Sequence, residues 1–239
     1  KHHEVLIRSI DERKPINVQE FVEDFEERGD IHLLDQWSLR SILTSHQSGI
    51  LRPESSFAVN VSAYSIENPS FQRWFTSFCN QASGQVGLIL EITETSPITD
   101  FHLINKFCEI SKASGFEIAI DDFGSGYANE DYLLNIKADY LKLDGSLIRE
   151  MKSSQTWKQL QETMSSCRKK GIKVIAEQIE IPSQMKQAKL LGCGYGQGYL
   201  FGKPAKEQCD RKQVTQNYVD ARANEPKEIE AGEVHTLSR

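Results

Sequence analysis

Polar and acidic side chains recur near the ends of successive short apolar segments of this sequence. They are, in chain order, Asn60, Glu91, Asp121, Asp122, Lys142, Glu177 and Gln197. Oxygen atoms of carboxylates and amides are the ligands that Mg²⁺ and Mn²⁺ prefer. Several carboxylates in one site cannot all stay ionised without cations, because like charges raise one another's pKa. Two such ions about 4 Å apart can polarise a phosphate and activate a water for in-line attack. The pattern therefore predicts metal-assisted phosphoryl chemistry.

Each of these residues has a simpler interpretation when it is taken alone. A single acid after a strand is more often a helix N-cap or a surface charge, and we assign such a role to Asp100 and, taken alone, to Glu94. Asn60 could cap the following loop, and Lys142 could be solvated at a rim. The Asp-Phe-Gly triplet at 122–124 is also found in kinases, but no kinase glycine loop or HRD motif accompanies it. The recurrence at several strand ends favours one shared site.

The segments that must position these residues are short apolar runs, which alternate with longer amphipathic stretches. Runs rich in Val, Ile, Leu and Phe are typical of strands that are buried on both faces. The predicted strands are Val5–Ile7, Phe57–Val61, Val86–Ile92, Phe116–Ile120, Asp139–Leu143, Ile172–Ala176 and, less regularly, Gly194–Leu200. The predicted helices are Val18–Glu27, Leu33–Ser45, Phe71–Ala82, Leu103–Ser114, Tyr132–Ile136, Trp157–Lys170 and Ser183–Leu191. Gly115, Gly171 and Gly192 lie where a helix should end.

This alternation predicts an α/β fold with a parallel sheet and right-handed crossovers. A doubly wound open sheet satisfies the order, and a TIM-like (β/α)8 barrel fits better if its first strand is missing from the chain. In a barrel the carboxyl ends of the strands line the active-site mouth, which would bring the polar residues together. We expect residues 1–205 to form this domain. Residues 206–239 are expected to form a polar helix, over Gln208–Ala223, and a solvated tail.

The composition narrows the classes of function. The net charge of −6 provides no global basic field that would attract duplex DNA or anionic lipid. The five cysteines form no CxxC pair, which argues against a disulfide scaffold or a zinc site and suits a reducing cytoplasm. No apolar stretch approaches the ~20 residues that cross a bilayer. We expect a cytoplasmic domain, which could be the cytoplasmic part of a larger membrane-anchored protein with an upstream sensor or regulatory domain.

Together the motifs resemble those of the EAL domain family. Glu4-Val5-Leu6-Ile7-Arg8 looks like the ExLxR signature, with Val in the usual Ala position. The other matches, in family order, are Asn60-Val61-Ser62 (NxS), Glu91-Ile92-Thr93-Glu94 (ExTE), 121–127 (DDFGTGY), Lys142-Leu143-Asp144 (KxD), 176–180 (AEGVE) and 197–204 (QGYxFxxP). Single motifs are weak, but the ordered set over most of the chain is specific.

The resemblance implies a TIM-like barrel that hydrolyses cyclic di-GMP to linear pGpG with two Mg²⁺ or Mn²⁺ ions. The implied metal ligands are Glu4, Asn60, Glu91, Asp121, Asp122 and Glu177, with Asp121 shared between the ions. The implied catalytic residues are Lys142, which would orient the attacking water, with Asp122, Glu177 and Gln197. The implied substrate contacts are Leu6, Arg8, Asp144 and Gln197. Glu94 and Glu180 would stabilise the loop after Asp122, and a homodimer is expected as in relatives.

Three departures from the family pattern leave alternatives open. The segment 128–131 (Ala-Asn-Glu-Asp) replaces a small and apolar stretch, Ser9 replaces the usual Trp, and Gln178 replaces Gly. A side chain at 178 is expected to be tolerated if the backbone angle there is ordinary. Such a chain could be a weak or inactive receptor that reports cyclic di-GMP to a partner, and an unrelated metal-assisted hydrolase is a third alternative. Because every implied metal-ligand position is filled, we favour an active enzyme.

Overall fold

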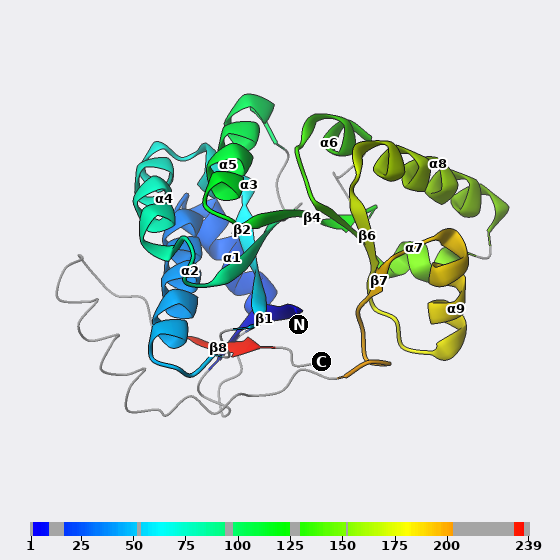
Figure 1. The fold of residues 1–239 in the computed structure, drawn as a ribbon, viewed down its shortest axis with the longest axis horizontal. Helices are drawn as coiled ribbons and strands as arrows, with labels where there is room; N and C mark the ends of the chain where they lie inside the picture. Colours follow the sequence, from blue (N-terminus) through cyan, green and yellow to red (C-terminus); the bar gives the residue numbers. More distant parts are fainter. Residues whose placement is uncertain are drawn as a thin grey trace.

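The computed structural model describes residues 2–9, 17–51, 54–93, 98–124, 130–151, 153–202 and 232–236 (Figure 1). Within these residues the strands form a single sheet in the order β7-β6-β5-β4-β3-β2-β1-β8. The strands are β1 (His2–Ser9), β2 (Ser56–Ser62), β3 (Gly87–Thr93), β4 (Glu117–Phe123), β5 (Tyr140–Leu143), β6 (Lys173–Ala176), β7 (Tyr195–Gly196) and β8 (Gly232–Thr236). Strands β1 to β7 pair in parallel, each with the next along the chain.

The parallel strands form a curled half-barrel with helices outside it, which confirms the predicted TIM-like α/β fold (Figure 1). The helices are α1 (Val18–Glu27), α2 (Ile31–Gln47), α3 (Ala63–Glu67), α4 (Pro69–Ala82), α5 (Phe101–Ala113), α6 (Glu130–Asn135), α7 (Gly145–Glu150), α8 (Ser154–Lys170) and α9 (Pro182–Leu191). Of these, α3 and α7 were not predicted. Each has six residues or fewer, which is too short for a clear 3.6-residue pattern.

Local capping residues set many of the helix ends. The Asp100 side chain accepts hydrogen bonds from the backbone N–H groups of His102 (2.8 Å) and Leu103 (3.2 Å), so its predicted capping role is confirmed. Helices α8 and α9 end on Gly171 and Gly192, both in the left-handed conformation, as predicted. These caps fix where each helix stops and therefore where the following strand begins.

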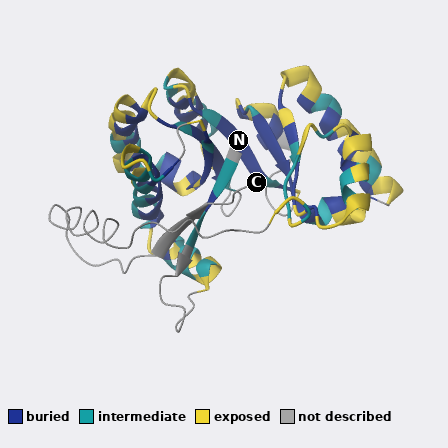
Figure 2. Ribbon diagram, turned by 60° about the horizontal axis from the view of Figure 1, so that its bottom comes forward, coloured by how far each residue is buried: buried dark blue, intermediate teal, exposed yellow. Residues whose placement is uncertain are grey.

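Alternate residues of the strands are buried on opposite faces of the sheet. Most of the core lies between the outer face and the helices, whose own outer surfaces are exposed (Figure 2). A second, smaller cluster lies on the inner face: Ala58, Ile89, Ala119 and Tyr140, with Ile175 packed against it. Because residues on both faces are buried, the central residues of β2, β3 and β4 are apolar.

Strand β8 was not anticipated from the sequence. It pairs antiparallel with β1, from Val5 opposite Thr236 to Ser9 opposite Gly232. Edge strands carry unpaired N–H and C=O groups, and an added strand satisfies them. The predicted helix at 208–223 lies outside the described residues, so that part of the tail stays a prediction.

The last predicted strand, Gly194–Leu200, is shortened to the two residues of β7. Beyond them, the Ile179 N–H donates to the Gln197 carbonyl (2.9 Å), and the Phe201 N–H donates to the Gly198 carbonyl (3.0 Å), forming a turn. Gly198 has φ +144°, and a Cβ atom there would lie 2.2 Å from the backbone nitrogen of Ile179. Only glycine fits this close approach of two backbone segments.

We expect Gly198→Ala to lower the free energy of unfolding by at least about 2 kcal/mol, because the added carbon strains the turn and displaces Ile179. Urea denaturation would measure the change. Gly194→Ala is the matched control in the same segment, since a Cβ atom there meets nothing within 4 Å. Equal stability of the two variants would show that the backbone contact is not constraining.

Candidate metal centre

Five of the predicted site residues each lie two positions after a residue of the apolar cluster on the inner face of the sheet. Side chains of a strand alternate between faces, so a residue two positions further along points the same way. Five inner-face residues and their followers are Ala58 and Asn60, Ile89 and Glu91, Ala119 and Asp121, Tyr140 and Lys142, and Ile175 and Glu177. The apolar layer therefore forms a floor, and the polar residues lie above it at the carboxyl ends of the strands.

Lys142 lies at the middle of this layer and is 1% exposed. Its Nζ atom lies 2.7 Å from Asp121 Oδ1, 3.0 Å from Glu91 Oε1 and 3.1 Å from Glu177 Oε1. Asp121 comes from the neighbouring strand β4, Glu91 comes from β3, one strand further on, and Glu177 directly follows β6 on the other side. The alternative that Lys142 is a solvated rim residue is therefore wrong.

Negative charge exceeds positive charge around this lysine. Three carboxylates surround one ammonium, which leaves an excess of two negative charges when all are ionised. Burial raises the pKa of Glu177 to about 8 and raises that of Glu91 well above its usual value. Burial alone would lower the pKa of Lys142, but the carboxylates raise it well above its usual range, so the ammonium stays charged. The excess is the charge that one divalent cation would neutralise.

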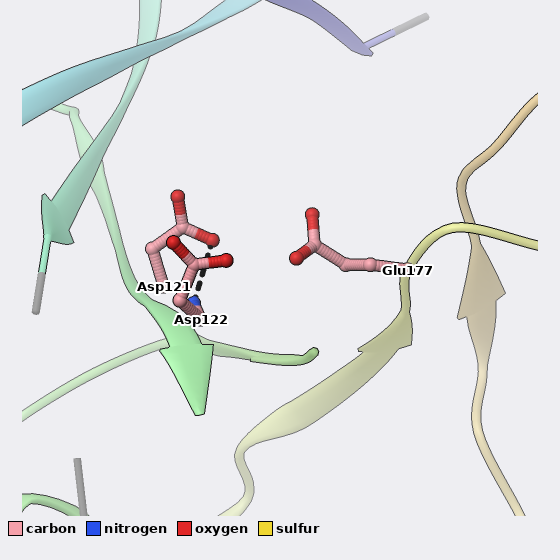
Figure 3. Close-up of side chains that lie close together, drawn as sticks. All are labelled: Asp121, Asp122 and Glu177. Carbon is pink, nitrogen blue, oxygen red and sulfur yellow. Dashed lines mark hydrogen bonds between the residues drawn. The ribbon is translucent and has the colours of Figure 1, made fainter. Parts of the chain in front are cut away.

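Asp121, Asp122 and Glu177 form the tightest acidic group of the described residues. One oxygen of each lies within 4.8 Å of those of the other two. In Figure 3 the two aspartates extend from the end of β4 toward Glu177, which reaches across from the end of β6. The Asp122 N–H donates to Asp121 Oδ1 at 2.9 Å. Both aspartates were expected to follow the strand, but they lie within it.

A register shift in β4 explains how two successive aspartates serve one site. The pairing of β4 with β5 shifts between Ile120 and Phe123. Asp122 has φ +50°, the left-handed region that costs a residue with a side chain about 1–2 kcal/mol. Neighbouring side chains on a regular strand would point to opposite faces. The irregular backbone instead directs both carboxylates toward Glu177, and burial together with Asp121 raises the pKa of Asp122 to about 6.

The chemistry of the donor atoms matches what a divalent cation requires. Among the described residues, Glu91 Oε2 is a buried oxygen without a hydrogen-bond partner. An unpartnered buried carboxylate oxygen is costly, and a cation would satisfy it. All the acidic donors are oxygen atoms, which suit Mg²⁺ or Mn²⁺. The residues therefore fit the predicted metal.

Glu4 and Gln197 join the two ends of the parallel sheet. Gln197 Nε2 donates a hydrogen bond to Glu4 Oε2, although strands β1 and β7 do not pair with each other in the described part of the chain. Asn60 is exposed and is paired in register with Glu91 on the neighbouring strand. The structure thus brings Glu4, Asn60 and Gln197 to the same end of the sheet as the acidic group.

The remaining predicted residues have various positions. Leu6 and Arg8 lie on β1, beyond Glu4. Asp144 is the N-cap of α7, where it accepts from the Ser146 N–H at 2.8 Å. Glu180 is exposed, and its backbone N–H donates to Gln184 Oε1. Glu94 lies outside the described residues. The substrate and loop roles of these residues stay predictions.

The backbone angle at Gln178 is not ordinary. The expectation that a side chain is tolerated at this position depended on an ordinary angle, so that condition is not met. Its φ is +48°. Its side chain compensates by accepting from Arg149 Nη1 (2.8 Å) and donating to Asp144 Oδ2 (3.4 Å). The positive φ redirects the chain directly after Glu177, and these two contacts hold this conformation beside α7.

Metal affinity should increase as the pH is raised from about 6 to 8. A cation binds the deprotonated carboxylates, and the raised pKa values of Asp122 (about 6) and Glu177 (about 8) mean that protons compete within this range. We expect Mn²⁺ affinity to increase up to about tenfold per pH unit for each proton displaced. Calorimetry in buffers of different ionisation enthalpy would measure the protons released. An affinity that is independent of pH would contradict the raised pKa values.

Fold and site together define a β/α-barrel protein with an acidic centre at the carboxyl ends of its strands. The sequence model described as the EAL domain matches residues 1–204. This chain belongs to the EAL domain family.

Curated relatives and a solved structure agree with this assignment. The chain is 31% identical over 207 residues to cyclic di-GMP phosphodiesterase PdeF of Escherichia coli K12, covering 85% of this chain and 28% of the relative. It is 35% identical over 157 residues to cyclic di-GMP phosphodiesterase PdeA of Borreliella burgdorferi, covering 62% and 22%. The structure of PaMucR phosphodiesterase in complex with c-di-GMP is 27% identical, with TM-score 0.69, covering 88% of this chain and 86% of that one. This chain spans about a quarter of the length of these curated relatives.

Proposed function

We propose that this chain hydrolyses cyclic di-GMP to linear pGpG. The observation that carries the proposal is the buried cluster of Lys142 with Glu91, Asp121 and Glu177, whose excess negative charge suits divalent cations. The relatives named as cyclic di-GMP phosphodiesterases and the relative solved with c-di-GMP bound support the choice of substrate. The intact acidic set favours turnover over binding alone.

The proposed ligands of the two ions are Glu4, Asn60, Glu91, Asp121, Asp122 and Glu177. Bound Mg²⁺ or Mn²⁺ would polarise a phosphate oxygen and lower the pKa of a water. Lys142 directs its three N–H donors at three carboxylates. With cations held by those carboxylates, the Lys142 ammonium would donate a hydrogen bond to the attacking water and orient it. Addition of this water to phosphorus would break one P–O bond of the ring: the water loses a proton, the leaving ribose oxygen gains one, and the cyclic dinucleotide opens to pGpG.

The other proposed roles concern substrate and surroundings. Leu6, Arg8, Asp144 and Gln197 would contact the nucleotide, and Gln197 also holds Glu4 in place. Glu94 and Glu180 would support the loop after Asp122. A homodimer, an upstream regulatory domain and a cytoplasmic location belong to the same proposal. None of the helices in the described part of the chain combines the length and apolar character needed to cross a membrane.

The test is incubation of the folded protein with cyclic di-GMP and Mg²⁺ or Mn²⁺, with and without EDTA, followed by chromatography. We expect metal-dependent appearance of pGpG. Tight binding without conversion would show that the chain acts as a cyclic di-GMP receptor and not as an enzyme. If the folded chain neither binds nor converts cyclic di-GMP, the proposed substrate is refuted as well.

A further inference from the structure

A buried acid outside the metal centre contacts the end of β2, the strand that carries the proposed metal ligand Asn60. Asp35 lies on α2 and is 6% exposed. Its Oδ2 atom accepts the backbone N–H of Ser62 at 2.9 Å. Ser62 is the last residue of β2 and follows Asn60 by two positions. A helix that covers the outer face of the sheet is thus bonded to the strand that carries a proposed metal ligand.

A second acid holds the same serine from another helix. Glu26 on α1 accepts the Ser62 hydroxyl at 3.2 Å through Oε1. Burial raises the pKa of Asp35 to about 7, and the nearby charge of Glu26 adds to the rise. A buried acid beside another acid is costly, and the nearby Ser65 side chain and the hydrogen bond to Ser62 offset the cost only in part. Burying these two acids together therefore does not stabilise the fold by itself. They lie at the end of β2, the strand that carries Asn60.

The sheet register shows what the contact would control. Asn60 is paired with Glu91, and Ser62 is paired with Thr93. If Ser62 lost its acceptor, the carboxyl end of β2 could shift against β3. Asn60 is exposed, so few contacts of its own side chain would resist such a shift.

We propose that Asp35 is a positioning residue, which fixes the carboxyl end of β2 and thereby holds Asn60 beside Glu91 for metal binding. Its acceptor oxygen, and not its charge, performs this role. The inference rests on the proposed function for the identity of the site, and its metal-binding test is independent of turnover.

The test compares Asp35→Leu, which removes the acceptor but fills the space, with Asp35→Asn, which keeps an acceptor oxygen. Mutation of a group that orients a metal ligand typically costs 10–100-fold in metal affinity. Asp35 acts on Asn60 through Ser62, so we expect the Mn²⁺ dissociation constant of Asp35→Leu to increase about tenfold. Asp35→Asn should stay within about threefold of the unmodified protein. In the hydrolysis assay, Asp35→Leu should lower kcat and leave the KM for cyclic di-GMP unchanged.

Leu39→Ala is the control for a purely structural effect. Leu39 lies one turn further along α2 and is fully buried, so its truncation lowers the melting temperature through the core. It should leave the Mn²⁺ dissociation constant unchanged. If Asp35→Leu does not fold, Asp35→Ala takes its place.

Two results would overturn the proposal: unchanged Mn²⁺ affinity in a folded variant without the acceptor, or equal weakening in Asp35→Asn and Asp35→Leu. Loss of affinity in Leu39→Ala as well would also refute a specific role. Absence of turnover in the unmodified protein would refute the proposed function alone, because calorimetry still compares metal binding among the variants.

Discussion

Asp121→Asn should abolish hydrolysis of cyclic di-GMP, with a loss in kcat of at least about a thousandfold, since metal-ion catalysis contributes several kcal/mol. Asp121 makes the shortest of the three ion pairs of Lys142 and accepts a hydrogen bond from the Asp122 N–H. It also belongs to the acidic group with Asp122 and Glu177. The amide has one oxygen instead of two and carries no charge. Both proposed ions would lose a ligand, while the side chain keeps its size.

Asp139→Asn is the matched control for this change. Asp139 also pairs with a lysine, Lys112, at 2.9 Å, but it precedes β5 at the opposite end of the sheet. We expect it to leave turnover within about threefold, because Asp139 lies outside the acidic group and its partly exposed ion pair contributes only about 1 kcal/mol or less to stability. Retained turnover in Asp121→Asn would overturn the assignment of the metal ligands.

Lys142→Met should destabilise the metal-free protein by about 3–5 kcal/mol, since removal of one partner leaves buried charges uncompensated. Glu91, Asp121 and Glu177 would face one another without a cation. Added Mn²⁺ should therefore raise the melting temperature of this variant more than that of the unmodified protein. Turnover should still be lost, because the group proposed to orient the water is gone.

The control for the lysine is Lys112→Met, whose pair with Asp139 is about one third exposed. It should change the free energy of unfolding by about 1 kcal/mol or less. Thermal denaturation with and without Mn²⁺ measures both variants. Equal responses to Mn²⁺ in Lys142→Met and Lys112→Met would show that Lys142 does not substitute for a cation in the metal-free site.

The sequence by itself determined most of the strands and helices, although not α3, α7 or β8, and it determined which end of the sheet is polar. These features are local. Alternation with a period of two places Asn60, Glu91 and Lys142 on the inner face once the apolar residues before them are buried. Asp100 caps its own helix through amides two and three residues away, so its role could also be predicted from the sequence.

Only the tertiary structure decided how these residues contact one another. The three partners of Lys142, the bond between Gln197 and Glu4 and the contact of Asp35 with Ser62 join residues far apart in the chain. Such contacts depend on how the sheet curls and on which helix face packs against it, and no local pattern encodes either. The positive φ angles of Asp122 and Gln178 have the same origin, because surrounding contacts hold backbone conformations that local preference disfavours.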